Sequence, residues 1–255
     1  MRKFLEKYLA HRPLFLSLIR AKEAWLWQKY LPLKKPVLDL GCGDGFFAKV
    51  AFGQLDVGLD VKDSRIDEVV SSTYKKIVIY DGHKIPLKTH SVNTVVSNCV
   101  LEHIENLDEV LGEIYRVLKP GGRFLTTVMA KPWEENLAGS LLMGNSYKAW
   151  MRKKQVHFNL LDSGEWNGEF KKAGFKIREE IGYLSPAACR LIDICHYLSL
   201  PSLVLYTLTG KWTFWPNLAP ISFLEKIMSK NVAPKKSGAV FFVMEMEEGR
   251  TTPDK

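Results

Sequence analysis

The stretch VLDLGCGDGFFAKV at residues 37–50 decides the fold, because it joins an apolar run to a helical pattern through a glycine-rich turn. Glycine at Gly41, Gly43 and Gly45 allows positive φ and lets backbone N–H groups approach a ligand with no Cβ in the way. In a parallel sheet the ligand lies beyond the carboxyl ends of the strands, next to such a turn. The stretch therefore predicts a strand, a ligand-binding turn and a helix, although a purely structural turn would show the same glycines.

After residue 36, short apolar runs alternate with amphipathic segments, which is typical of a parallel sheet with helical crossovers. The sequence KPGG (119–122) ends one of these helices, because proline cannot continue a helix and glycine suits a turn. We predict an α/β fold: a Rossmann-like doubly wound sheet, mostly parallel with an antiparallel last strand. The expected strands are 36–40, 56–60, 76–80, 93–97, 123–129, 175–183 and 237–248, and the expected helices lie near 45–53, 64–71, 106–118 and 163–173.

We expect one domain over residues 1–255, built around a ligand-binding core at residues 36–130. Residues 1–35 form an N-terminal arm of two short amphipathic helices separated at Pro13. Residues 131–162 read as a looser segment. Residues 186–236 exceed what an ordinary α/β connection needs, so they form an apolar helical insert before the last strand.

The cysteines Cys42, Cys99, Cys189 and Cys195 form no C-x-x-C pair and have no matching histidine spacing. Neither a disulfide framework nor a zinc site is indicated, and a reducing, cytoplasmic location fits best. The apolar segment near the N-terminus is too short for the core of a signal peptide.

The net charge of +8 is concentrated in the N-terminal arm, where residues 1–35 hold nine Lys or Arg and two Glu. A basic segment of this kind can contact nucleic acid or anionic lipid. It can also be a solvated helix face, which is the simpler interpretation.

The residue Asp60 closes the expected second strand 21 positions after Asp39, a spacing typical of a nucleoside-binding βαβ unit. A carboxylate there can accept both hydroxyls of a ribose, or it can cap the next helix. Asp44 lies inside the turn, where its charge would oppose a pyrophosphate. The pattern favours a ligand with a ribose, no phosphate and a positive group near Asp39, and S-adenosylmethionine meets all three conditions.

Four motifs then follow in order: VLDLGCGDG (37–45), GLD (58–60), DGHKIPLKTHSVNTVVSNCVLEHI (81–104) and VLKPGGRFL (117–125). Together they resemble the motifs of class I S-adenosylmethionine-dependent methyltransferases, with the closest similarity to the type 11 group of small-molecule and lipid methyltransferases. The resemblance covers residues 35–130 densely and 155–183 loosely. It implies an enzyme, a methyltransferase, with S-adenosyl-L-methionine as its cofactor.

The resemblance also implies roles for the first two motifs. Asp39, Gly41 and Gly43 would hold the methionine portion of the cofactor, and Asp60 would take the ribose hydroxyls.

For the third motif the resemblance implies contacts with the adenine and the acceptor. Asp81 would accept from the adenine amino group, and the N–H of Gly82 or His83 would face a ring nitrogen. Asn98 would face the cofactor and the incoming acceptor. An Asx turn capping the strand is an equally good interpretation of Asp81.

Methyl transfer from a sulfonium is an in-line displacement, so the main tasks of the enzyme are alignment and the exclusion of water. A hydroxyl or carbon acceptor would also benefit from a general base. Of the nearby histidines His83, His103 and His157, we take His103 and His157 as the candidate bases, and each could instead be structural. The sequence indicates no metal ligand set.

Two absences count against nucleic-acid bases as substrates. The position after the fourth strand reads SNCV rather than the Asn/Asp-Pro-Pro-aromatic motif of enzymes that methylate exocyclic amines. Cys99 follows Asn98 rather than proline, unlike the nucleophile of cytosine-C5 methyltransferases, and reads as a small buried residue.

The insert is the best clue to the acceptor, because residues 194–210 contain no Asp, Glu, Lys or Arg. His196 and Pro201 argue against a transmembrane helix there. The insert can be a lid over the pocket, or an element on a membrane surface with Trp212 and Trp215 at headgroup depth and the basic arm attracted to anionic lipid. Both interpretations imply an apolar acceptor.

We therefore expect a methyltransferase that acts on an apolar small molecule or a lipid-like acceptor, in the cytoplasm or peripherally on a membrane. One alternative is a partner subunit that binds the cofactor without catalysis and uses the insert as its interface. Another is an RNA or protein methyltransferase that uses the basic arm.

Overall fold

The computed structural model describes residues 1–69, 72–210 and 220–247. Its chain divides into two compact units, each assembled from three segments. The helical unit consists of Met1–Lys29, Lys131–Gln155 and Gly182–Ala239, and the sheet unit consists of Tyr30–Ala130, Val156–Ile181 and Val240–Lys255. The expectation of a single domain stays a prediction.

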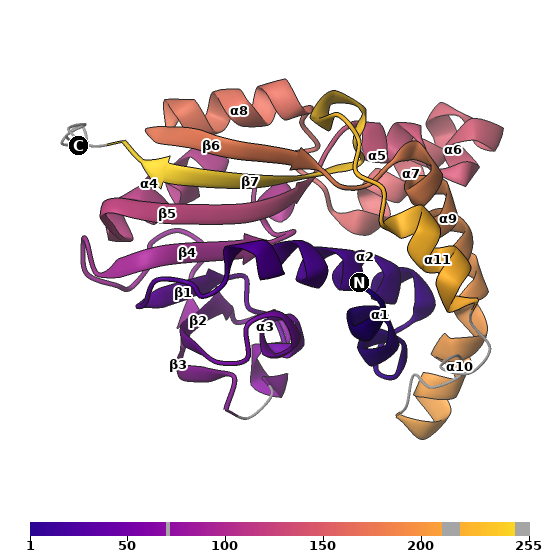
Figure 1. The fold of residues 1–255 in the computed structure, drawn as a ribbon, viewed down its shortest axis with the longest axis horizontal. Helices are drawn as coiled ribbons and strands as arrows, with labels where there is room; N and C mark the ends of the chain where they lie inside the picture. The colour runs from indigo at the N-terminus through magenta and orange to yellow at the C-terminus, as the bar shows by residue number, and fades with distance from the viewer. Residues whose placement is uncertain (70–71, 211–219, 248–255) are drawn as a thin grey trace. The chain divides into compact units, whose positions relative to one another are not determined.

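The sheet unit is built on seven strands in the order β3-β2-β1-β4-β5-β7-β6 (Figure 1). The pairs from β3 to β5 are parallel, and β5, β7 and β6 are antiparallel. This confirms the predicted Rossmann-like sheet, with its switch point between β1 and β4. The strands are β1 (Val37–Leu40), β2 (Leu55–Val61), β3 (Tyr74–Tyr80), β4 (Val92–Asn98), β5 (Leu118–Met129), β6 (Phe175–Gly182) and β7 (Ala239–Met246).

Three helices of the sheet unit agree with the predicted ones: α3 (Phe46–Ala51), α4 (Leu107–Val117) and α8 (Ser163–Lys172). The expected helix near 64–71 is wrong over its described part, which holds only a 3-10 turn, η2 (Ile66–Glu68). The N–H and hydroxyl of Ser64 both donate to the carbonyl of Val61. A tight turn thus takes the place of the first helical turn.

Buried aromatic residues join α8 to the strands. The ring of Phe170 packs edge to face on Phe242 of β7 and on Phe124 of β5, with centroid distances of 5.0 and 6.2 Å. The preceding residue of β7, Phe241, points to the opposite face of the sheet and packs on Tyr30. Both faces of β7 are therefore covered, as its continuous apolar sequence requires.

The sequence KPGG does end α4, but the structure places these residues inside β5 rather than in a free turn. The pairing with β4 shifts register between Val92, opposite Leu118, and Thr94, opposite Arg123. Gly121 has a φ of +69° at this point. The turn is thus a bulge-like interruption within β5, and the pairing with β4 resumes at Arg123.

The helical unit confirms both the N-terminal helices and the helical insert. Residues 131–155, expected to be a looser segment, instead form three helices. The helices of this unit are α1 (Arg2–Leu9), α2 (Leu14–Trp27), α5 (Pro132–Glu135), α6 (Ala138–Met143), α7 (Asn145–Gln155), α9 (Pro186–Leu198), α10 (Leu200–Thr209) and α11 (Ile221–Met228); the short 3-10 turns η1 (Gln28–Tyr30), η3 (Leu101–His103) and η4 (Pro234–Lys236) complete the element list of the two units.

The N-terminal arm is not a simple solvated face, because Lys22 of α2 is fully buried. Its ammonium donates to the carbonyl of Ser229 at 3.1 Å and to Oδ1 of Asn231 at 2.8 Å. Burial lowers the pKa of Lys22 to about 8. Part of the basic charge of the arm is therefore used to hold the helical unit together.

The neighbouring carboxylate of Glu23 is also fully buried. It accepts from the hydroxyl of Tyr183 at 2.8 Å and from the guanidinium of Arg20 at 2.7 Å. These contacts tie α2 to the residues that follow β6.

We predict that Glu23→Ala lowers the free energy of unfolding by about 3 kcal/mol, because it leaves the tyrosine hydroxyl and the guanidinium without their buried acceptor. Urea unfolding followed by circular dichroism measures this change. The control is Glu6→Ala, which removes an exposed pair with Arg2 and should cost less than about 1 kcal/mol. Equal losses for the two variants would contradict the prediction.

Candidate functional site

A cavity of about 420 Å³ opens at the carboxyl ends of β1, β2, β3 and β4, beside the switch point of the sheet. Its wall comes from the turn after β1, the ends of β2 and β3, and the loop after β4. The lining residues are Gly41, Asp60, Val61, Tyr80, Gly82, His83, Cys99, Val100, His103, Ile104, Glu105 and Asn106.

A larger and more open hollow of about 770 Å³ lies between the start of α4, the segment before α8 and the last turn of α8. It shares Glu105 and Asn106 with the cavity, but none of its lining residues belongs to the glycine turn or to a strand end. We therefore assign ligand binding to the smaller cavity, where the geometry of an α/β sheet places a ligand.

The glycines of the turn after β1 differ in what they do. Gly41 has a φ of +75°, and a Cβ there would lie 2.3 Å from a methyl group of Val100. Gly43 also has positive φ, but nothing lies within 4 Å of the position its Cβ would take. Gly41 is thus required by packing against the loop after β4, whereas Gly43 has no neighbour at the position of a Cβ.

The carboxylate of Asp60 holds this turn in place. Its Oδ2 accepts from the N–H of Gly43 at 2.7 Å, and its Oδ1 accepts from the N–H of Val61 at 2.8 Å. Each carboxylate oxygen can accept a second hydrogen bond. Asp60 therefore combines a structural role with two acceptor sites at the cavity wall, and it does not cap a helix.

Asp39 lies outside the cavity lining. It is buried, and its Oδ2 accepts from the hydroxyl of Tyr74 at 2.5 Å. Burial raises the pKa of Asp39 to about 7; the hydrogen bond from Tyr74 opposes this increase, and the charge of Asp60 adds to it. The role of Asp39 next to the methionine ammonium stays a prediction.

The residues after β3 form an Asx turn, the alternative that the sequence left open for Asp81. Oδ1 of Asp81 accepts from the N–H groups of His83 and Lys84, and these bonds lower its pKa. The N–H of His83 is therefore committed, which leaves Gly82 as the donor toward a ligand. The bond between Nδ1 of His83 and Glu109 raises the pKa of this histidine.

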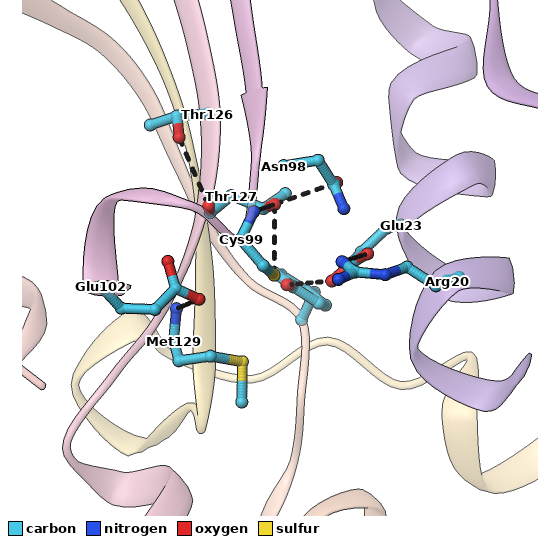
Figure 2. A network of polar contacts seen from close by, with 9 residues as sticks. Arg20, Glu23, Asn98, Cys99, Glu102, Thr126, Thr127 and Met129 are labelled. Atoms are coloured by element: carbon cyan, nitrogen blue, oxygen red, sulfur yellow. Dashed lines mark hydrogen bonds and ion pairs between the residues drawn. The ribbon is translucent and has the colours of Figure 1, made fainter. Parts of the chain in front are cut away.

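The end of β4 is fixed by Thr127 of β5, as Figure 2 shows. Its hydroxyl donates to Oδ1 of Asn98 at 3.0 Å and accepts from the N–H of Cys99 at 3.0 Å. Cys99 has a φ of +53°, which is rare for a residue other than glycine and is sustained here by these bonds. Asn98 itself is outside the lining, and its contact with a ligand stays a prediction.

Glu102 is a buried carboxylate of this loop that the sequence analysis missed. Its Oε1 accepts from the N–H of Met129 at 3.2 Å, as drawn in Figure 2. Its carbonyl accepts from the N–H groups of Phe158 and Asn159. A glutamate between Leu101 and His103 carries no periodic signal that would have marked it as buried.

These bonds bring the two candidate bases together. His103 lines the cavity, and its ring centroid lies 5.0 Å from that of His157. Nδ1 of His103 lies 3.1 Å from the carbonyl of Val156. A carbonyl only accepts, so Nδ1 carries a proton and this bond fixes the orientation of the ring.

Of the predicted residues, the cavity lining therefore includes Gly41, Asp60, Gly82 and His103. The other predicted residues lie outside the lining: Gly43, which is bonded to Asp60, His157, which lies beside His103, and Asp39, Asp81 and Asn98. Tyr80, Cys99 and Val100 line the cavity without having been predicted as site residues. Among the described residues, no group of three or more His, Cys, Asp or Glu side chains is arranged to hold a metal ion.

Comparison with known proteins supports the class that this sheet and cavity define. Residues 38–126 match a family model described as a methyltransferase domain. A Mycolicibacterium smegmatis protein named as a probable S-adenosylmethionine-dependent methyltransferase is 25% identical over 170 residues, which is 64% of this chain and 60% of that protein. A demethylmenaquinone methyltransferase from Symbiobacterium thermophilum is 28% identical over 38% of this chain and 43% of its own length.

Among solved structures, a Thermotoga maritima methyltransferase described as a possible histamine N-methyltransferase covers 97% of both chains, with a TM-score of 0.57 and 16% identity. This likeness shows the fold. The chain spans less than two thirds of the length of the two relatives named above.

The match over residues 38–126 and the similarity to these relatives support the resemblance to class I S-adenosylmethionine-dependent methyltransferases that the motif series predicted. The family supports an enzyme and implies S-adenosyl-L-methionine as the cofactor.

The residues present fit this cofactor. Gly41 brings backbone without a side chain to the cavity wall, and Asp60 offers acceptors for two hydroxyls. The volume of the cavity is within the range of small-molecule sites.

We predict that Asp39 lowers the free energy of unfolding of the protein without cofactor as the pH rises from about 4 to about 7. Its pKa is near 7 in the folded state and near 3.8 in the unfolded chain, so between these values only the folded state holds the proton. Asp39→Asn should remove this fall, because the amide oxygen still accepts from Tyr74 and carries no charge. Melting temperatures measured for both proteins across this range test the prediction, and parallel profiles would contradict it.

Proposed function

We propose that the protein transfers a methyl group from S-adenosylmethionine to an apolar small-molecule or lipid-like acceptor by in-line displacement. The observation that carries the proposal is the cavity at the switch point, where the carboxylate of Asp60 offers acceptors for two hydroxyls. The bound cofactor supplies a methyl group already activated on a sulfonium. The residues of the chain are then left with binding, alignment and the exclusion of water.

In this proposal Asp60 accepts from the ribose hydroxyls while it keeps the N–H of Gly43 in place. The N–H of Gly82 faces the adenine ring. His103 is the base where the acceptor is a hydroxyl or an acidic carbon, since its Nε2 is oriented by the bond at Nδ1. His157 supports the ring of His103 from its other side.

The apolar nature of the acceptor is supported by the insert. In α10 only Ser202 is buried, and the exposed residues include Leu203, Val204 and Leu208. The helix contains no charged residue. A helix that is apolar all round gains stability only when something covers it, and an apolar ligand or a lipid surface would do so.

Within the described residues, no single helix has the length and apolar composition needed to cross a membrane. The pair α9 and α10 passes that test only when taken together, and the pair is bent by 45°. Trp212 and Trp215, which the sequence placed at headgroup depth, lie outside the described residues. The cytoplasmic location and the choice between a lid and a membrane element stay predictions.

The structure weakens the alternative of an RNA or protein methyltransferase built on the basic arm. Lys22 is buried, Arg20 pairs with Glu23, and Arg2 pairs with Glu6. Fewer of these cations are left to contact phosphates than the sequence suggests.

We predict that Asp60→Ala weakens S-adenosylmethionine binding about 100-fold, the loss expected for two hydrogen bonds to a charged acceptor. Isothermal titration calorimetry measures the change. The control is Asp63→Ala, which removes an exposed carboxylate of the same loop that is not part of the cavity lining. Unchanged binding by Asp60→Ala, with its fold intact, would remove the proposed role of this carboxylate.

The acceptor is tested by incubating the protein with methyl-labelled S-adenosylmethionine and a cell extract, followed by phase separation. We expect the label in the organic phase, because the apolar insert favours a lipid or hydrophobic metabolite. Label confined to the RNA or protein fraction would overturn the proposed acceptor class. Any turnover by the isolated chain would eliminate the alternative of a partner subunit without catalysis.

A further inference from the structure

The α6–α7 hairpin (residues 138–155) of the helical unit carries an exposed apolar tip. Leu141, Leu142 and Met143 are consecutive, and their exposed fractions are 60%, 86% and 59%. Gly144, with a φ of +61°, then turns the chain into α7. Runs of three exposed apolar residues are unfavourable in water unless they serve a function.

The tip is not a frayed end, because the other side of the hairpin is firmly held. The hydroxyl of Tyr147 donates to Asp193 of α9 at 2.6 Å, and the other oxygen of Asp193 accepts from the N–H of Gly139 at 2.9 Å. A Cβ at Gly139 would lie 2.3 Å from the Tyr147 ring. The indole of Trp133 donates to Gln155 at the end of α7.

Tyr147 and Met151 of α7 are buried, whereas Trp150, Lys153 and Lys154 of the same helix are exposed to solvent. Trp150 is 45% exposed, and the three residues share one stripe because they are spaced three and four apart. An exposed tryptophan beside two lysines is typical of helices that lie at the headgroup level of a membrane.

The positive charge around the hairpin also indicates contact with an anionic membrane surface. Residues 136–161 contain four Lys or Arg and no Asp or Glu. Arg152 pairs with Glu134 of α5, whereas no ion pair is recorded among the described residues for Lys153 and Lys154. A positive stripe next to an apolar tip is complementary to an anionic lipid surface, which offers phosphates above and hydrocarbon below.

We propose that the α6–α7 hairpin docks on an anionic lipid bilayer. Leu141, Leu142 and Met143 enter the acyl boundary, Trp150 lies at headgroup depth, and the two lysines contact lipid phosphates. In Figure 1 this hairpin and α10 meet α9 at different places, so this contact is distinct from the apolar insert. RNA would also attract the lysines, but it offers nothing to the apolar tip.

The test measures cosedimentation of the full chain with vesicles, without cofactor or acceptor, so that its failure leaves the proposed methyl transfer untouched. The vesicles are phosphatidylcholine alone or with about 30% phosphatidylglycerol. We expect binding only to the anionic vesicles, and weaker binding at high salt. No binding by the wild-type chain, or equal binding to both vesicles, would overturn the proposal.

Charge is tested with Lys153→Glu/Lys154→Glu, which should weaken partition to anionic vesicles at least about 20-fold. The matched control is Lys235→Glu/Lys236→Glu, an exposed lysine pair of the same unit with the same change in charge. The control should bind as the wild type does. Equal losses by the two variants would mean non-specific attraction and would overturn the proposal.

The apolar tip is tested with Leu141→Ser/Leu142→Ser/Met143→Ser, which should weaken partition at least about tenfold. The comparison is Leu203→Ser/Leu208→Ser in α10, which should retain most of the partition. Loss only in the α10 variant would place the membrane contact on the insert and overturn the assignment to the hairpin. The proposal would also be overturned if the wild-type chain bound RNA but no vesicles, and if only the double lysine variant lost the RNA binding.

Discussion

The close approach of Gly41 to Val100 is the contact on which the site depends. It brings the turn after β1 against the loop after β4, on the two sides of the switch point. With these two segments in contact, the N–H of Gly43 reaches the carboxylate of Asp60 at the end of β2. Three neighbouring strand ends are thereby held around one cavity, and any side chain at Gly41 would push them apart.

The loop after β4 is also held by hydrogen bonds to β5 and to the segment that carries His157. Thr127 holds Cys99 in a backbone conformation that favours glycine, and Glu102 ties the loop to the end of β5 and to the segment that carries His157. In this loop the ring of His103 is bonded to the backbone carbonyl of Val156 and packs beside the ring of His157. In an enzyme whose donor is already activated, such alignment is the main contribution of the protein.

The helical unit has a mainly apolar interior, but it also buries three charged residues and exposes several apolar ones. Lys22, Glu23 and Asp193 are buried with hydrogen-bond partners, whereas the tip of α6 and most of α10 expose leucines. A buried charge is costly unless it is hydrogen-bonded. These three residues have such partners, so the helices of the unit must pack in the one arrangement that brings the partners together. The leucines left outside indicate that this unit is completed by contact with something apolar.

The sequence by itself determined the sheet and the positions of its turn motifs, because glycines at fixed spacing and apolar strands act through local backbone preference; the same motifs carried the methyltransferase resemblance of residues 38–126. It could not determine that Asp39 turns toward Tyr74, that Lys22 is buried, or that residues 131–155 form helices with an exposed tip. Nor could it show that Glu102 is buried. Each of these depends on partners far away in the chain, and only the tertiary structure decides which polar groups meet and which apolar residues remain uncovered.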